Sequence, residues 1–109
     1  MSKFELYRDA SDQFRFRLKA ANGQNILSSQ AYTSKDGCKN GIESVKTNCS
    51  DDHCFEKLES KNGEPYFNLK STNGQVIGTS QMYSSDSAMQ TGIDSVKANA
   101  GSAEIEDIS

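Results

Sequence analysis

The sequence predicts an α+β fold made from a tandem repeat, in which a β-β-β-α unit of about 50 residues occurs twice and a C-terminal strand follows. Aligning residues 4–49 with residues 55–100 without a gap gives 19 identities in 46 pairs, so the chain contains two copies of one unit. Each copy shows strand-like alternation and then changes to the periodicity of an amphipathic helix. We therefore expect one continuous antiparallel sheet with two helices packed on one face.

The two copies are expected to share one core. We interpret residues 1–109 as a single compact domain, with repeat one at 4–49 and repeat two at 55–100. This length suffices for folding without disulfides or metals. The hydrophobic fraction is 34% and the mean hydropathy is -0.73, which favours a modest core and a sheet with one solvated face.

The first strand of each copy is short and ends in a turn. Residues 4–8 and 55–59 alternate weakly between apolar and polar positions. Turn-forming residues follow, but 11–13 read Ser-Asp-Gln whereas 62–64 read Asn-Gly-Glu. This difference predicts that the two turns are of different types.

The clearest strand pattern lies at residues 14–19, where apolar and basic residues alternate strictly. The dipeptide Asn22-Gly23 follows and is typical of a type I′ hairpin turn, which leads into a strand at 25–28. The second copy repeats the hairpin with residues 66–70, Asn73-Gly74 and 76–78. Pro65 precedes it at a strand's first position, where a missing N–H is tolerated.

Each copy then continues into a helix of about three turns, because apolar residues recur on one helical face. Thr33 or Ser34, and Ser84 or Ser85, are suitable N-cap residues. We expect Asn48 and Asn99 to close the helices in the left-handed conformation. Glycine inside both helices favours a packing explanation, in which the backbone passes close to the sheet or to the other helix, and the approach of a ligand is the alternative. The residues on these faces are Cys38, Gly41, Ile42 and Val45, and Met89, Gly92, Ile93 and Val96.

The C-terminal residues 103–108 alternate partially and predict a last short strand. We expect this strand to occupy, after the second helix, the place that residues 55–59 occupy after the first. The sheet would then run continuously through both halves.

Charge is divided unevenly between the copies. The net charge of -3 is the sum of +3 in residues 1–50 and -6 in residues 51–109. Either the unlike halves complement each other on a solvated surface, or the first half offers a basic patch to an acidic partner.

Few residues suit catalysis or metal binding. Cys49, His53 and Cys54 form the one cluster of metal-ligand types, and they lack the CxxC or HxxxH spacing of zinc sites. No phosphate-binding glycine loop is present. We expect no catalytic residues, no metal and no cofactor, although a thiol protein using these three residues stays an alternative. Because the start lacks a secretory signal and no stretch could cross a membrane, we expect a cytoplasmic protein without a membrane partner.

One exposed surface carries a possible binding function. If Phe14, Phe16 and Leu18 face the helices, six polar side chains face the other way. Basic and aromatic groups on an open sheet face are typical of single-stranded nucleic acid binding, although a pI near 5.1 is unusual for such proteins. A solvated face that prevents aggregation is the simpler interpretation. The residues are Arg15, Arg17, Lys19, Tyr66, Asn68 and Lys70.

The repeated motifs resemble those of the YegP-like family of small bacterial proteins. They are Phe-Arg-Phe-x-Leu-Lys with Asn-Gly, Ser-Gln-x-Tyr, and Gly-Ile-x-Ser-Val-Lys-x-Asn, and they cover nearly the entire chain. The resemblance implies one antiparallel sheet with strands exchanged between the units and both helices on one side. It also implies a monomer or weak homodimer, and no established activity, cofactor or binding residues.

These observations favour a non-enzymatic binding or interaction module with an unidentified protein partner. Its binding surface would be the open sheet face or the groove between the two helices. The duplication presents two similar surfaces about a pseudo-twofold axis. Single-stranded nucleic acid binding through the sheet face is one alternative, and a small enzyme or thiol redox protein is the other.

Overall fold

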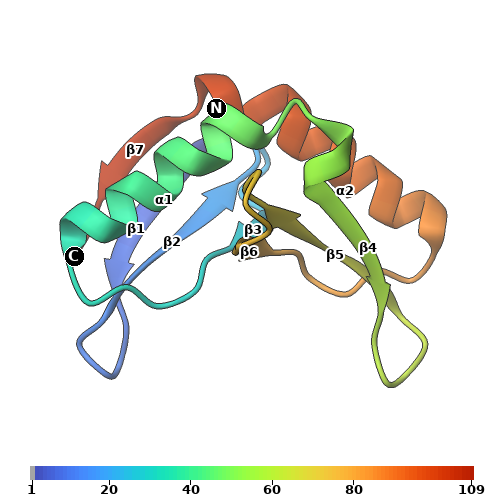
Figure 1. The fold of residues 1–109 in the computed structure, drawn as a ribbon, viewed down its shortest axis with the longest axis horizontal. Coiled ribbons are helices and arrows are strands. Elements are labelled where there is room, and N and C mark those ends of the chain that lie inside the picture. Colours follow the sequence, from blue (N-terminus) through green and yellow to red (C-terminus); the bar gives the residue numbers. More distant parts are fainter. Residues whose placement is uncertain (1) are drawn as a thin grey trace.

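The computed structural model describes residues 2–109 as two similar halves joined in one sheet (Figure 1). Each half has three strands followed by a 14-residue helix. The first half comprises β1 (Lys3–Arg8), β2 (Phe14–Lys19), β3 (Asn25–Ser28) and α1 (Lys35–Asn48). The second comprises η1 (Asp52–Cys54), β4 (Phe55–Glu59), β5 (Pro65–Lys70), β6 (Val76–Thr79), α2 (Asp86–Asn99), η2 (Ala100–Ser102) and β7 (Glu104–Asp107). The predicted repeat is confirmed.

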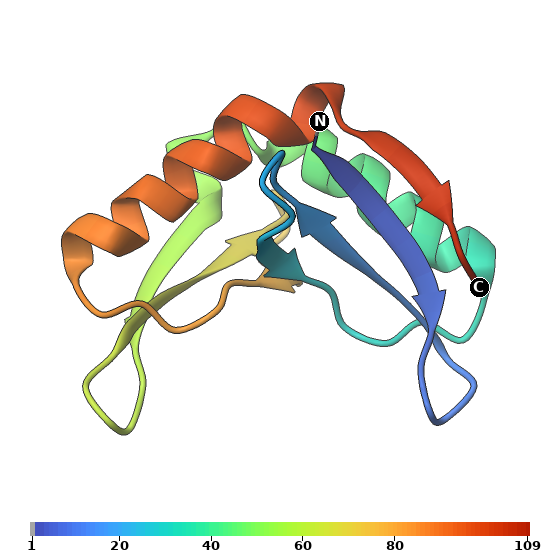
Figure 2. The ribbon, with the colours of Figure 1, turned by 180° about the vertical axis from the view of Figure 1, so that it is seen from behind.

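The strand order is β4-β5-β6-β3-β2-β1-β7, and β7 is the strand that departs from the expected topology. Every other pair is antiparallel, but β7 pairs with β1 in parallel, from Lys3↔Glu104 to Leu6↔Asp107. After α2 the chain turns through η2 at the end of the sheet where β1 begins, so β7 runs in the same direction as β1 (Figure 2). The sheet is therefore mixed rather than wholly antiparallel. In addition, β4 corresponds to β1, because β4 pairs with β5 as β1 pairs with β2. The expectation that β7 takes the place equivalent to that of β4 is therefore wrong, because β7 pairs with β1 instead.

The two halves meet at the centre of the sheet through few backbone contacts. Ser28↔Thr79 is the one registered pair between β3 and β6. The side chain of Leu27 fills the space at the equivalent position of the other half, Gly78, where a Cβ atom would lie 2.8 Å from Leu27 Cγ. Side-chain packing therefore contributes more to this junction than the ladder of hydrogen bonds does.

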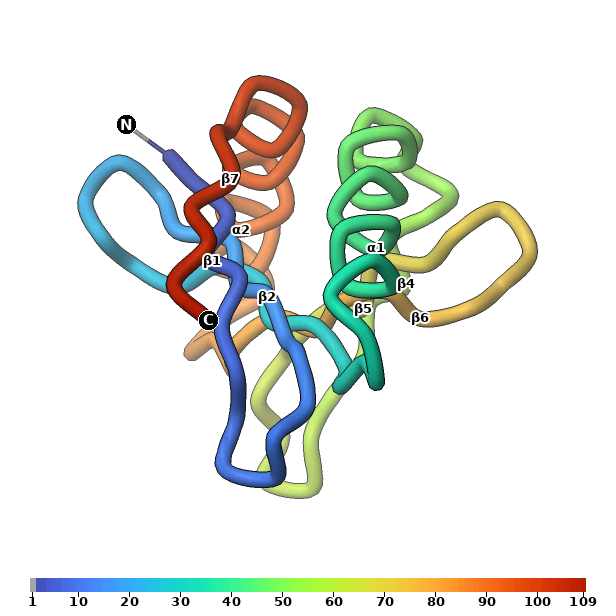
Figure 3. The backbone as a smooth tube through the Cα atoms, turned by 90° about the vertical axis from the view of Figure 1, so that its left-hand side faces the viewer, coloured from blue at the N-terminus to red at the C-terminus, as the bar shows by residue number. Residues whose placement is uncertain are grey.

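Both helices cover one face of the sheet, as predicted, and each spans the two halves. Helix α1 contacts β1 and β2 of its own half and also β5 and β6, whereas α2 contacts β5 and β3. Figure 3 shows the consequence for the hairpins: the β2–β3 turn lies beside α2, and the β5–β6 turn lies beside α1. The hairpin of each repeat thus meets the helix of the other.

The core fills the layer between helices and sheet. Phe16 and Phe67, the central aromatic residues of the two halves, are fully buried and stack on Tyr32 and Tyr83 with ring centroids 6.3 Å apart in each case. The largest other buried side chains are Phe4, Leu6, Leu18, Leu27, Ile42, Leu69, Ile93, Val45, Val96 and Cys38.

The helices begin as predicted but end differently. The hydroxyls of Ser34 and Ser85 accept hydrogen bonds from the backbone of the first turns and cap them. The left-handed ends predicted at Asn48 and Asn99 are wrong, because Cys49 and Ala100 are the C-caps and both are right-handed. The asparagine side chains instead donate to the carbonyls of the preceding turn, as Asn48 does to Ser44 at 2.8 Å.

All four hairpin turns have the same form, contrary to two predictions. At the first central turn, Gly23 N donates to Ala20 O and Ala20 N donates to Gln24 O, and only Gly23 has a positive φ. This is a type I turn followed by a left-handed residue, whereas type I′ needs two such residues. Asp12 (φ 66) takes the left-handed position that Gly63 (φ 79) occupies in the second half, so these two turns do not differ.

Candidate functional site

The six residues predicted on the open sheet face lie in two separate groups. Strands β3 and β6 separate β2, which carries the first three residues, from β5, which carries the others. In the first group, Arg15 Nε contacts Asp9 at 2.8 Å and Arg17 Nε contacts Glu5 at 2.7 Å. Lys19 Nζ lies 3.4 Å from the same carboxylate of Glu5.

Two of the three residues in the second group, Asn68 and Lys70, are also paired, whereas Tyr66 lies half-buried on β5. Lys70 Nζ lies 3.0 Å from Glu56, and Thr79 donates a hydrogen bond of 2.8 Å to Asn68. Hydrogen bonds from Arg17 and from Lys70 hold the pKa values of Glu5 and Glu56 below their usual range. Each of these basic side chains thus contacts a carboxylate, although Arg17 and Lys19 share that of Glu5, and this weakens the argument for nucleic acid binding at this face.

The cysteines lie in the core and are poor nucleophiles. Cys38, Cys49 and Cys54 are buried and unbridged. Burial raises the pKa of all three thiols, that of Cys38 to about 11, so the reactive thiolate is disfavoured. His53, which the sequence analysis grouped with Cys49 and Cys54, has a side chain that is 97% exposed. Residues 2–109 contain no group of three His, Cys, Asp or Glu residues arranged to hold a metal ion.

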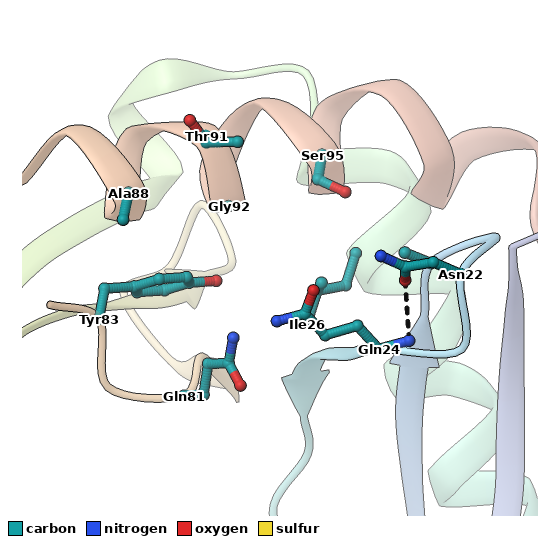
Figure 4. A pocket seen from close by; sticks show the side chains of 10 residues that line it. Asn22, Gln24, Ile26, Gln81, Tyr83, Ala88, Thr91, Gly92 and Ser95 are labelled. Atoms are coloured by element: carbon teal, nitrogen blue, oxygen red, sulfur yellow. Dashed lines mark hydrogen bonds between the residues drawn. The ribbon is translucent and has the colours of Figure 1, made fainter.

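A cavity of about 470 Å³ lies where the first repeat's hairpin meets the second repeat's helix (Figure 4). The β2–β3 hairpin forms one wall, the segment before α2 forms another, and α2 covers it. Ten residues line it: Ala20, Asn22, Gln24, Ile26, Gln81, Tyr83, Ala88, Thr91, Gly92 and Ser95.

A second cavity of about 250 Å³ lies at the equivalent place between the second repeat's hairpin and α1. All nine of its lining residues have their counterparts, 51 positions away, in the lining of the first cavity, and six of the nine pairs are identical. Across the whole repeat only 19 of 46 pairs are identical, so identity is concentrated at these cavities. The second lining is Tyr32, Gly37, Asn40, Gly41, Ser44, Ser71, Asn73, Gln75 and Ile77.

The tyrosine in each cavity explains the glycine in each helix. A Cβ atom at Gly92 would overlap the hydroxyl of Tyr83, and one at Gly41 would overlap that of Tyr32. The packing explanation predicted for these glycines is therefore correct, but the close neighbour is a tyrosine from the segment before the same helix. Replacing either glycine would displace a ring that stacks on the core.

The hydroxyl of Tyr83 is buried and has no hydrogen-bond partner among the described residues. Burial raises the pKa of this phenol, and the Gln81 side chain lies near enough to lower it slightly, although the two groups do not meet hydrogen-bond geometry. An unpaired buried hydroxyl costs about 1–3 kcal/mol. The free protein therefore carries a polar group at this cavity that does not contribute to its stability.

Both cavities are lined without charged side chains, in a chain in which 25% of the residues are charged. Carboxamides and hydroxyls provide the polar groups, and each can both donate and accept a hydrogen bond. Neither cavity lies between the two helices, where the sequence placed a possible groove. The sequence reasoning missed this site because each cavity combines residues from both repeats, although the repeated Asn, Gln, Tyr and Ser residues were a signal.

Comparisons with known proteins agree with the repeat. A family described as "Domain of unknown function (DUF1508)" matches twice, at residues 9–56 and 60–107. A UPF0339 protein of Shewanella oneidensis is 51% identical over 105 residues, which are 96% of this chain and 96% of that protein. The UPF0339 protein YegP of Escherichia coli K12 is 49% identical over 95% of this chain and 94% of its own length.

Two solved structures match the fold closely. The solution NMR structure of the Shewanella oneidensis protein SO3888 has a TM-score of 0.93 at 50% identity and covers 98% of this chain and 91% of that one. That of yegP from E. coli, described as a protein of unknown function, has a TM-score of 0.93 at 48% identity, with 98% and 92% covered. In the part of the chain that the structure describes, no helix is long and apolar enough to span a membrane. The doubled family match and these relatives together show that the chain belongs to the DUF1508 family, alongside the UPF0339 proteins.

Proposed function

We propose that this protein is a non-enzymatic binding module and that its binding sites are the two equivalent cavities. The observation that carries the proposal is the identity of six of the nine lining pairs, formed twice from a hairpin and the opposite repeat's helix. Each chain would then bind two similar ligands, or one ligand with two similar parts.

The shared lining residues differ in whether their side chains hold the fold together. Asn22 stabilises its turn, because its Oδ1 accepts from Gln24 N at 2.9 Å. By contrast, the side chains of Gln24 and Gln75 are exposed and make no hydrogen bond within residues 2–109. A carboxamide kept in both repeats without a structural partner supports a binding role for these positions.

The composition of the cavities favours binding over catalysis. Neither lining includes Asp, Glu, His, Lys or Cys. The tyrosines are the titratable groups present, and burial moves the pKa of both upwards, away from neutrality. A general acid or base is most effective when its pKa is near the working pH, so these cavities are better suited to holding a ligand than to transferring protons.

The proposal can be tested by NMR. The ¹⁵N-labelled protein is screened with a mixed set of small neutral and charged fragments, and backbone shifts are followed. We expect the shifts to concentrate at Gly92 and Ser95 and at Gly41 and Ser44, and to disappear in the Gln24→Ala/Gln75→Ala variant. Gln13→Ala, in a turn outside both cavities, is the matched control. Fragments that perturb only other surfaces, or an unaffected double variant, would refute the proposal.

A further inference from the structure

We propose that the larger cavity recognises an uncharged amide-type group, in which a carbonyl acceptor lies beside an N–H donor. Peptide-type amides and the lactam edges of nucleobases share this chemistry. The inference rests on the proposed function, because it names the ligand class of the same site.

The first argument concerns charge. Each lining side chain of this cavity is neutral, and the acidic and basic groups of the chain lie elsewhere. A charged ligand would lose its hydration without gaining a counter-charge, which is costly. The lining therefore selects neutral ligands. Its volume of about 470 Å³ falls within the size range of small-molecule sites.

The second argument concerns hydrogen-bond geometry. Asn22 and Gln24 on the hairpin and Gln81 before α2 place three carboxamides on the walls opposite Thr91 and Ser95 (Figure 4). A carboxamide presents a donor and an acceptor side by side, so it can form two hydrogen bonds with a group of the same kind. Gln24, whose side chain has no partner among the described residues, is available for such pairing.

The third argument is the unpaired hydroxyl of Tyr83. In Figure 4 the phenol points from the segment before α2 toward the hairpin side of the cavity, beneath Gly92. The hydroxyl is shielded from water and lacks an acceptor within residues 2–109. A ligand carbonyl would provide that acceptor once the phenol turns slightly from its shielded position toward the ligand. The Tyr83 hydroxyl would donate to the carbonyl of the ligand, and a carboxamide of the lining would pair with its N–H. Together these two contacts would select an amide group.

The test titrates the ¹⁵N-labelled full chain with four probes, namely N-acetylglycinamide, uracil, glucose and acetate. We expect saturable shifts at Gly92 and at the side-chain amides of Gln24 and Gln81 with the two amide probes only. The tighter of those two identifies the source of the amide as peptide or nucleobase. Saturable binding of glucose or acetate without the amides would overturn the inference but leave the binding function intact.

Variants separate recognition from folding. Tyr83→Phe should lower the affinity for the amide probes about tenfold. Because it removes an unpaired hydroxyl, it should unfold at the same or a higher urea concentration than the parent chain. Tyr7→Phe, on β1 and outside both cavities, is the matched control and should leave binding at Gly92 unchanged. Unchanged affinity in Tyr83→Phe would overturn the inference. If none of the four probes binds while other fragments bind at Gly92, only the ligand class is wrong.

Discussion

The outer edges of β1 and β4, the first strands of the two halves, share one backbone design, but only the edge of β1 is covered by another strand. On the first edge, β7 pairs with β1, and Lys3 and Lys35 contact Glu106 and Asp107 at 3.2 Å and 2.9 Å. On the second edge, no strand among residues 2–109 pairs with the side of β4 that faces away from β5. The side chains differ accordingly: Leu6 on β1 is fully buried, whereas its counterpart on β4 is the exposed Lys57.

This difference shows how an edge strand is made safe when no strand covers it. A bare edge offers unpaired backbone groups to other chains, and a charged residue pointing to the core side opposes such pairing. A second copy's β7 would also be repelled at β4, because Asp86 stands at the position equivalent to Lys35. Since β7 and β4 lie at opposite ends of the sheet, such pairing would give an open-ended chain of molecules.

At the junction of the halves, equivalent positions also carry different residues that complement each other. Leu27 and Gly78 are equivalent positions, and the leucine fills the space that the glycine leaves. Two leucines there would overlap, and two glycines would leave a hole. The halves are therefore alike in backbone but matched as unlike surfaces wherever they meet or end.

The largest expected effect tests this matching. Gly78→Leu should lower the free energy of unfolding by about 3 kcal/mol through overpacking. Leu27→Gly should lower it by about 4 kcal/mol, because it opens a cavity. The double variant transposes the pair and should recover at least about 2 kcal/mol of the summed loss, as measured by urea denaturation. Additive losses would show that the two residues do not complement each other.

Removal of residues 104–109 tests the covered edge. The truncation exposes Leu6 to water and removes the two ion pairs of β7, and it should cost about 2 kcal/mol in urea denaturation. It should also increase self-association through β1, detected by sedimentation at rising protein concentration. Unchanged stability would mean that β7 contributes nothing to the first edge.

Acid stability should separate the equivalent carboxylates Glu5 and Glu56. The Glu5 side chain is 9% exposed and that of Glu56 is 41% exposed, and basic neighbours lower the pKa of both. A lowered pKa in the folded state contributes stability above the unfolded value of about 4.3, and this stability is lost as the pH falls below it. Between pH 7 and pH 3 the free energy of unfolding should fall. We expect Glu5→Gln to make this fall smaller by more than Glu56→Gln does. The reverse order would contradict the assignment.

Replacing Lys57 tests the bare edge of β4 with little expected change in stability. Lys57→Leu should leave the urea midpoint nearly unchanged but make the protein associate as its concentration rises. Adding Asp86→Lys should strengthen this association, because position 86 would then carry the positive charge of its equivalent Lys35, which contacts Asp107 of β7 in the first half. Lys61→Leu, in the β4–β5 turn, is the control. A double variant that stays monomeric in light scattering would argue against this role of Lys57.

The smallest effect concerns the turns. Asp12 holds the left-handed conformation that Gly63 holds in the second half. Glycine adopts it without strain, so Asp12→Gly should stabilise the protein by about 0.5 kcal/mol in thermal and urea unfolding. Gly63→Asp should have the opposite effect. Destabilisation by Asp12→Gly would show that the Arg8–Asp12 ion pair outweighs the backbone strain.

Local patterns in the sequence were enough to predict the repeats, the hairpins and the helix starts at Ser34 and Ser85. Features that depend on how the two copies pack were not predictable in this way. The direction of β7 follows from where α2 ends in space. The larger cavity combines a hairpin with a helix about 70 positions away, and the smaller one combines a hairpin with a helix about 35 positions away. The turn at Asp12 was misjudged because aspartate can adopt a conformation that is more typical of glycine. The binding roles of Arg15, Arg17, Lys19, Tyr66, Asn68 and Lys70 stay predictions.

The pairing of β7 with β1 also has a consequence for synthesis. About 100 residues separate the two partners in this pair, so β1 is synthesised long before β7. While the chain is still being made, β1 can form its hairpin with β2, but its outer edge stays bare until residues 104–107 emerge from the ribosome. During that interval the nascent chain can pair with its neighbours through β1, and the arrival of β7 ends this exposure.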